Sequence, residues 1–465
     1  MIINRTEKEK SQTPRDKLNV ERVLTGSLIF FGLLPSQSGT GCSRRWQMMR
    51  AAFWISLAAV SVIFEFMSKI NTLIQTPNRD IEVLYLVQYS QYWIKTIAVV
   101  LILTIFYRKS SKIVSLMDQL NVPESHHADD DKVHRREGLK EYHRTGCLLM
   151  ALAIIICTMT TMRVLDLISL ASDATASAKL FGMEVNLFGV EVVKYFTRDC
   201  TEPIRLLCSG YIGLLLCRFS TGLAVESRKL LQQHASNNRA CSLGVLTRTD
   251  ICSAWKAREA ALTMSRTIQE ECGLLLLVIL LADVLCLNAS FANFLSLIMP
   301  HVQPEVQYHA KDLIRNCAQI ILYSMSAYTL TFWLIRLDDI DKSTQEIVKI
   351  LQSTNCHHIM SKTTPRLTIG GLESYGSSSK DAQGHEKLQE KDDLAMPLFM
   401  LDSSCFQTRA VAPCIAGCGP VTRVTVFSVL GILVTFFCFM MDQVGRGQEK
   451  NDRSILPSYN SSCST

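Results

Sequence analysis

Charged residues are scarce in this chain of 465 residues, where Asp, Glu, Lys and Arg make up 19% and apolar residues 48%. Soluble domains carry about 25% charged residues, so the composition favours a polytopic membrane protein over a soluble protein of several domains. A basic domain with interleaved aromatic residues is also lacking, and the net charge of +6 therefore does not indicate a nucleic-acid partner. Residues 1–22 are polar and the apolar run Val23–Leu34 is short, so no cleavable signal peptide is expected.

Motifs that carry chemistry are missing as well. Neither a nucleophile elbow nor a phosphate-binding loop is found, and we expect neither an enzyme nor a bound cofactor. Many of the 17 cysteines lie inside apolar runs, where Cys acts as a small hydrophobe, and they predict no disulfide framework. Two groups could be offered as metal sites but lie on a flexible loop or around a disordered insert, which does not preset a coordination geometry. They are His126, His127 and Asp129–Asp131, and Cys356, His357, His358, Cys414 and Cys418.

Long apolar stretches are what the chain does have. Crossing the hydrocarbon core takes a helix of roughly 20 residues. The sequence predicts an all-α polytopic membrane protein with seven transmembrane helices, over residues 51–70, 83–107, 145–171, 203–223, 272–298, 316–337 and 421–441. Heptad-like apolar positions in residues 224–271 predict that the fourth and fifth helices extend beyond the membrane, and the sixth is predicted to continue through Asp338–Ser353. The polar segment Thr363–Asp393 is predicted to be disordered.

The distribution of basic residues predicts the topology. Roughly 30 Lys and Arg residues lie in the amino-terminal segment and in the loops after spans two, four and six, against roughly 10 in the other loops and the tail. Because basic residues favour the cytoplasmic side, the amino terminus is predicted to be cytoplasmic and the carboxy terminus extracellular. A G-protein-coupled receptor would need the inverse arrangement.

The last apolar stretch carries a stripe of small and hydroxylated residues at helical spacing. Thr422, Thr425, Ser428, Gly431 and Thr435 recur three or four apart and so share one flank. Such a stripe suits close helix packing by small residues, or alternatively a face that lines a pore.

Polar side chains also occur at membrane depth in several spans, where they are costly unless they are used. Gln88, Tyr92 and Lys95 share a face of the second span, which suits an interfacial aromatic belt or a ligand pocket. Arg163 and Asp166 lie one turn apart and would either pair locally or contact a polar ligand. Lys95 with Asp283 or Asp166 is a further candidate for a buried pair.

The end of the chain resembles a known family. Ser428–Phe436, followed by five residues before Asp442 and then Gln443, is similar to the last transmembrane segment of arthropod gustatory receptors, which has Thr-Tyr, five apolar residues and Gln-Phe. Gly417 and Arg423 stand where that family tends to have a glycine and an arginine. Phe436 replaces the tyrosine, and Asp442 takes the glutamine position. Near the other end, Gly32-Leu-Leu-Pro35 resembles the Gly-Leu-x-Pro element that often precedes the first span.

The resemblance implies a chemoreceptor of the plasma membrane: a ligand-gated, non-selective cation channel assembled as a homotetramer or a heterotetramer with related receptors. Its seventh helix would line the pore and its ligand would be a small-molecule tastant or odorant, with membrane lipid around it. The pore residues implied are Thr435, Phe437, Met441, Asp442 and Gln443. The expected ligand-binding residues are Gln88, Tyr92, Arg163, Asp283, Tyr323 and Tyr328.

The expected organisation has five parts. These are an amino-terminal cytoplasmic segment (1–50) with an interfacial helix, helices one to six with cytoplasmic extensions (51–337), a partly disordered cytoplasmic loop (338–420), the pore helix (421–441) and an extracellular tail (442–465). Two other functions remain open: a seven-span receptor that signals through a cytosolic partner, and a transporter, although the two halves show no repeat.

Overall fold

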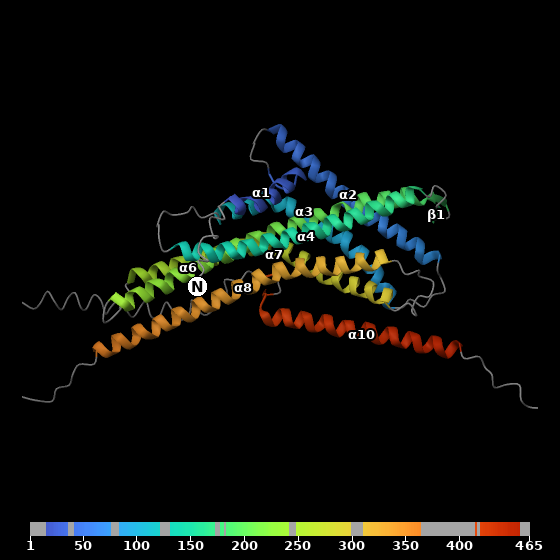
Figure 1. Cartoon of the computed structure of the whole chain (residues 1–465). Coiled ribbons are helices and arrows are strands. Elements are labelled where there is room, and N and C mark those ends of the chain that lie inside the picture. Colours follow the sequence, from blue (N-terminus) through green and yellow to red (C-terminus); the bar gives the residue numbers. More distant parts are fainter. Residues whose placement is uncertain are drawn as a thin grey trace, which may run out of the picture. The chain divides into compact units, whose positions relative to one another are not determined.

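The computed structural model describes residues 15–35, 41–75, 83–120, 131–172, 177–180, 183–240, 248–298, 310–363, 414–415 and 419–455. Helices dominate this part of the chain, as the predicted all-α class requires (Figure 1). They are α1 (Arg15–Phe30), α2 (Gly41–Gln75), α3 (Val83–Gln119), α4 (Asp131–Ser172), α5 (Leu187–Lys194), the π-helical turn η1 (Tyr195–Asp199), α6 (Thr201–Ala240), α7 (Arg248–Ile298), α8 (Ala310–Thr363) and α10 (Arg423–Ile455).

Two short antiparallel hairpins complete the described elements. Strand β1 (Ser177–Leu180) pairs with β2 (Met183–Asn186), and β3 (Cys414–Ile415) pairs with β4 (Gly419–Pro420). The first hairpin follows α4 and leads directly into α5, whose first turn is capped by Asn186. The side chain of Asn186 accepts hydrogen bonds from the backbone nitrogens of Phe188 and Gly189, at 2.8 and 3.4 Å.

The predicted spans coincide with long helices. Each of the first six falls within one helix, and the seventh lies on α10 apart from Val421 and Thr422, which precede it. In the described part of the chain, five helices are long and apolar enough to cross a membrane, and α10 has a shorter apolar stretch, Arg423–Phe436. The five windows are Arg44–Met67, Ala153–Ala171, Thr201–Val225, Glu259–Leu295 and Leu313–Glu346. A count of seven spans therefore stays a prediction for α3 and α10.

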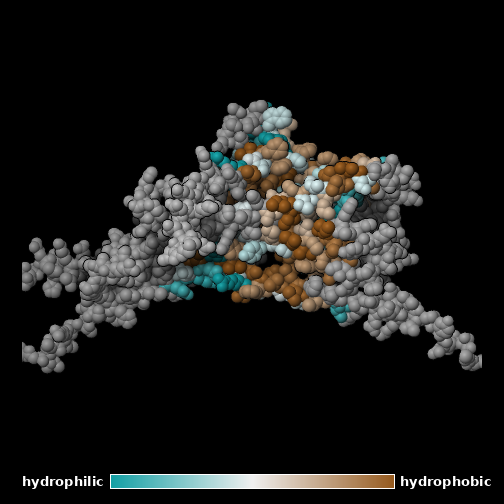
Figure 2. Space-filling model, viewed as in Figure 1, coloured by the Kyte–Doolittle hydropathy of each residue, from teal (hydrophilic) through white to brown (hydrophobic). Residues whose placement is uncertain are grey.

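Apolar side chains gather on the outside of these helices, where Figure 2 shows a broad band of hydrophobic residues on one face. Ile63 of α2, Ile154 and Ile168 of α4 and Val424 of α10 are each more than half exposed. Charged groups such as Arg205 are meanwhile fully buried. This inversion of the usual soluble pattern suits a surface in contact with lipid.

The described residues cluster into two compact units. The first holds most of the helical core, and the second comprises the described residues within Gly222–Thr267 and Arg336–Pro413. Helices α6, α7 and α8 each contribute residues to both units, because each runs on beyond its apolar window. Continuation of the fourth, fifth and sixth helices was expected from the sequence and is confirmed. The predicted disordered segment lies, beyond Thr363, outside the described residues.

Within the second unit, polar contacts join two of these helical extensions. Thr344 Oγ1 on α8 donates to Ser227 Oγ on α6 at 3.0 Å, and both side chains are buried. Along α8, Lys342 Nζ binds Asp338 Oδ2 at 2.6 Å, one helical turn away.

Gly32 ends α1 at a point where the chain lies close to the start of α2. Gly32 has a φ of +78°, in the left-handed region that glycine adopts readily. The nitrogen of Leu33 then turns back to donate to the carbonyl of Leu28 at 2.8 Å, which satisfies the end of the helix. A Cβ atom at position 32 would lie 2.5 Å from the carbonyl oxygen of Gln47 on α2. The Gly-Leu-Leu-Pro element thus allows the end of α1 to approach the backbone of α2.

Candidate functional site

A cavity of about 110 Å³ lies within the first unit, among residues of α3, α4, η1, α6 and α8. Apolar side chains from α4, α6 and α8 form part of its wall, and charged side chains from all five elements complete it. The lining residues are Lys95, Ile156, Met159, Thr160, Arg163, Asp199, Glu202, Pro203, Leu206, Arg315, Gln319, Leu322 and Tyr323.

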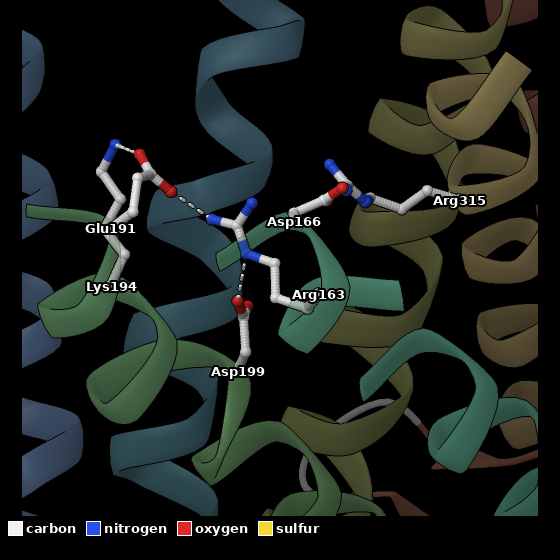
Figure 3. Close-up of polar contacts among 6 residues, drawn as sticks. All are labelled: Arg163, Asp166, Glu191, Lys194, Asp199 and Arg315. Carbon is white, nitrogen blue, oxygen red and sulfur yellow. Dashed lines mark hydrogen bonds and ion pairs between the residues drawn. The ribbon is translucent and has the colours of Figure 1, made fainter. Parts of the chain in front are cut away.

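Arg163 of α4 is held by two carboxylates from the segment that follows the first hairpin. Its Nε donates to Asp199 Oδ2 at 3.1 Å, and its Nη2 donates to Glu191 Oε2 (Figure 3). Lys194 also binds Glu191, at 2.7 Å. Guanidinium–carboxylate hydrogen bonds of this kind are directional, so they fix the Arg163 side chain at the cavity wall.

Asp166, one turn further along α4, has a different partner. Its Oδ2 accepts a hydrogen bond from Arg315 of α8 (Figure 3). The sequence left open a local pair between Arg163 and Asp166, and this interpretation is wrong. The physical reason is that each side chain meets an opposite charge on a neighbouring element, Arg163 toward α5 and η1 and Asp166 toward α8.

Beside the cavity lies a buried polar network centred on Arg205 of α6. Its Nη1 donates to Asp283 Oδ1 of α7 at 2.8 Å, and its Nε and Nη2 donate to Glu202 Oε1 at 3.2 and 2.9 Å. Ser326 of α8 donates to the other oxygen of Asp283 at 2.6 Å. The side chains of Arg205 and Asp283 are 2% and 0% exposed, so a buried ion pair joins α6 to α7, and the Ser326 hydroxyl adds α8 to the network.

Tyr323 of α8 connects this network to the cavity. Its hydroxyl donates to Glu202 Oε1 at 3.1 Å. Lys95 Nζ lies 5.2 Å from the centre of the Tyr323 ring, and the Arg205 guanidinium lies 5.6 Å from it. Both distances suit cation–π attraction between these cations and the Tyr323 ring.

Two of the six predicted ligand-binding residues, Arg163 and Tyr323, line the cavity. Asp283 lies beside it, bound to Arg205 and Ser326 and not to the Lys95 that the sequence suggested. Tyr328 is 59% exposed and packs on Phe332, with ring centres 5.8 Å apart, and it is not among the lining residues. Gln88 and Tyr92 belong to α3, but their side chains lie outside the described residues.

Sequence reasoning missed several lining groups, namely Asp199, Glu202 and Arg315. Glu202 and Arg205 are three apart at the start of an apolar stretch, a spacing that could have indicated a functional pair. Asp199 and Arg315 fall in segments that were expected to be loops. A charged residue in a loop is common and does not by itself indicate a functional site.

Cys200 directly follows η1, and its backbone nitrogen donates to the carbonyl of Tyr195 at 3.0 Å. Burial of the Cys200 thiol raises its pKa above the ordinary value.

The predicted pore residues belong to α10. Thr435 and Asp442 are exposed, whereas the side chains of Phe437, Met441 and Gln443 lie outside the described residues. The hydroxyls of Ser428 and Thr435 each donate to the backbone carbonyl four residues earlier, both at 2.9 Å. The helix can therefore present these hydroxylated positions to an apolar or a wet surface without leaving a donor unpaired.

Taken together, these features define a polytopic helical membrane protein with a charged cavity inside its helical core. The sequence matches no protein-family model and no curated protein. The structure, however, is similar to two solved structures of the insect olfactory receptor OR5 from Machilis hrabei. The complex with eugenol has a TM-score of 0.59 and 10% identity over 92% of this chain and 99% of that chain. The second structure has a TM-score of 0.52 and 10% identity over 91% of this chain and 99% of that one. The chain therefore has the fold of an insect olfactory receptor.

Proposed function

We propose that this protein is a gustatory-type chemosensory receptor that acts as a ligand-gated, non-selective cation channel in the plasma membrane. The observation that carries the proposal is the likeness in fold to an insect olfactory receptor over 92% of the chain. It agrees with the independent resemblance of residues 428–443 to the last helix of arthropod gustatory receptors. The sequence and the fold thus indicate the same superfamily.

The cavity is the proposed ligand site. The similar olfactory receptor was solved in complex with eugenol, a small molecule. In this chain, Arg163 and Tyr323 present polar groups to a cavity whose other walls are partly apolar. Small-molecule sites commonly combine apolar walls with a few placed polar groups. Gln88, Tyr92, Asp283 and Tyr328 stay predictions for this role.

The proposed pore helix is α10. Val424, Phe427 and Ile432 are each more than two-thirds exposed, so this apolar helix needs lipid or another subunit to cover it. In a tetramer, Thr435 and Asp442 would face the conduction path, with Gln443 next to the mouth. Phe437 and Met441 would form a hydrophobic gate, which closes by excluding water. The basic residues further support a cytoplasmic amino terminus and an extracellular tail beyond residue 441.

Whole-cell recording from cells that express this chain alone tests the proposal. Sugars, bitter alkaloids, amino acids and small volatiles are applied with G-protein signalling intact and then blocked. Asp442→Asn is recorded in parallel, with Glu346→Gln, an exposed carboxylate on α8, as the matched control. A ring of Asp442 carboxylates would concentrate cations at the mouth, so loss of this charge should lower the conductance.

We expect a ligand-evoked cation current that persists under the block. The conductance of Asp442→Asn should be reduced at low ionic strength and approach that of the wild type at 1 M salt, where the Debye length falls to about 3 Å. Glu346→Gln should behave as the wild type at both salt concentrations. A current that disappears under the block would instead favour a receptor acting through a cytosolic partner.

A further inference from the structure

The cavity is small. Its volume is about 110 Å³. An engineered apolar cavity of about 150 Å³ is known to hold benzene, which has six heavy atoms. A ligand of about four to six heavy atoms therefore suits a cavity of this volume.

Its charged groups carry both signs. Lys95, Arg163 and Arg315 are cationic, and Asp199 and Glu202 are anionic. Arg163 also pairs with Glu191, and Arg315 pairs with Asp166. An uncharged apolar ligand would displace water from these groups and return no hydrogen bonds, which is unfavourable.

Among the described residues, no hydrogen bond ends on Glu202 Oε2. Two hydrogen bonds from Arg205 and one from Tyr323 all end on Oε1. The side chain is 17% exposed and lines the cavity, so Oε2 is open to a donor that enters there. A carboxylate accepts strongly from an ammonium group because both partners are charged.

Arg163 offers the complementary group. Its Nε and Nη2 bind Asp199 and Glu191, which leaves Nη1 without a partner among the six residues drawn in Figure 3. A guanidinium nitrogen that is held in place and still has free hydrogens is suited to a carboxylate.

We propose that the cavity binds a small zwitterion that carries one ammonium and one carboxylate group, of the size of glycine or alanine. The ammonium group donates to Glu202 Oε2, and the carboxylate accepts from Arg163 Nη1. This inference rests on the proposed function in taking the cavity as the receptor's ligand site.

Equilibrium binding of tritiated L-alanine to the purified full chain in lipid nanodiscs tests the assignment. Unlabelled glycine, acetate, methylammonium and eugenol compete for the site. Glu202→Gln removes the charge while keeping an oxygen that Arg205 and Tyr323 can reach. Glu346→Gln is its matched control. Thr160→Leu, which fills part of the cavity without touching a charge, provides an independent variant, and all variants are first checked for a single monodisperse peak.

We expect alanine to bind the wild type and the Glu346→Gln protein equally, and to bind Glu202→Gln at least about tenfold more weakly, since a hydrogen bond between charged partners is lost. Thr160→Leu should lose binding through steric exclusion. Acetate and methylammonium, each with one of the two charges, should compete far more weakly than glycine. The assignment is overturned if alanine does not bind, if acetate competes as well as glycine, or if Glu202→Gln keeps wild-type affinity.

Parallel current recordings separate this inference from the proposed function. Alanine binding to a protein in which no ligand of the recording panel evokes a current would refute the channel and leave the zwitterion site intact. A current evoked by eugenol from a protein that does not bind alanine would leave the channel intact and refute the zwitterion site.

Discussion

The ion pair between Arg205 and Asp283 provides the sharpest test of how this helical core is held together. Arg205 Nη1 and Asp283 Oδ1 are 2.8 Å apart, and the two side chains are 2% and 0% exposed. The pair joins α6 to α7, and the bond from Ser326 to the second oxygen of Asp283 adds α8. Replacement of Asp283 by Leu would leave the Arg205 charge buried with Glu202 as its remaining carboxylate.

The expected loss follows from this burial. Removal of one partner from a buried pair costs about 3–5 kcal/mol, because the remaining charge loses its nearest buried partner, and here Glu202 compensates the Arg205 charge only in part. At roughly 2 °C per kcal/mol for a large chain, Asp283→Leu should lower the melting temperature by roughly 6–10 °C. The double variant Arg205→Met/Asp283→Leu removes both charges and should recover most of this loss. Recovery should be incomplete because Glu202 also loses two hydrogen bonds.

Thermal unfolding of the purified protein in detergent, followed by size-exclusion fluorescence, measures these shifts for the wild type, both single variants and the double variant. Asp166→Asn provides the comparison, since the Arg315–Asp166 pair is 29% and 25% exposed. That pair is less buried than the Arg205–Asp283 pair, so its loss should cost less, about 1 kcal/mol. If Asp283→Leu has the same melting temperature as the wild type, the Arg205–Asp283 pair does not stabilise the core. If the double variant shows the sum of the two single losses, Arg205 and Asp283 are not coupled and the reasoning fails.

Three further predictions rest on other contacts. Gly32→Ala should destabilise the protein by about 2 kcal/mol or more, because the alanine would have to adopt a left-handed conformation and its Cβ would clash with the backbone of α2. The melting temperature measures this loss. Gly26→Ala is the control, because a Cβ at position 26 would have no atom within 4 Å. Glu271→Gln should lower the free energy of unfolding by about 1 kcal/mol, because the carboxylate that binds both Lys109 and Lys112 is lost. The loss is small because both lysines are partly exposed. An unchanged melting temperature would refute this prediction. The Cys200 thiol should react with maleimide slowly at pH 7 and faster as the pH rises, because its raised pKa keeps the thiol protonated at pH 7. Mass spectrometry of the labelled peptide measures the labelling rate at each pH. Fast labelling at pH 7 would contradict the prediction.

Much of the fold was predictable because its signal is local. A run of about 20 apolar residues determines a helix that suits the hydrocarbon core wherever it lies in the chain. The helical continuation of the sixth span through Asp338–Ser353 was also predictable, since apolar residues recur at helical spacing between the charges. Pro35 likewise indicated the end of the first helix, because proline cannot continue a helix.

The candidate site was only partly predictable, because its contacts are not local. From the sequence alone, the polar residues at membrane depth indicated that Arg163 and Tyr323 were candidates, since such groups are costly unless used. Only the tertiary structure decided their partners. Arg163 pairs with Asp199, 36 residues away, and Arg205 pairs with Asp283, 78 residues away. Several opposite charges were available to each arginine along the sequence, and the packing of α4, α6, α7 and α8 determined which of them came within hydrogen-bonding distance.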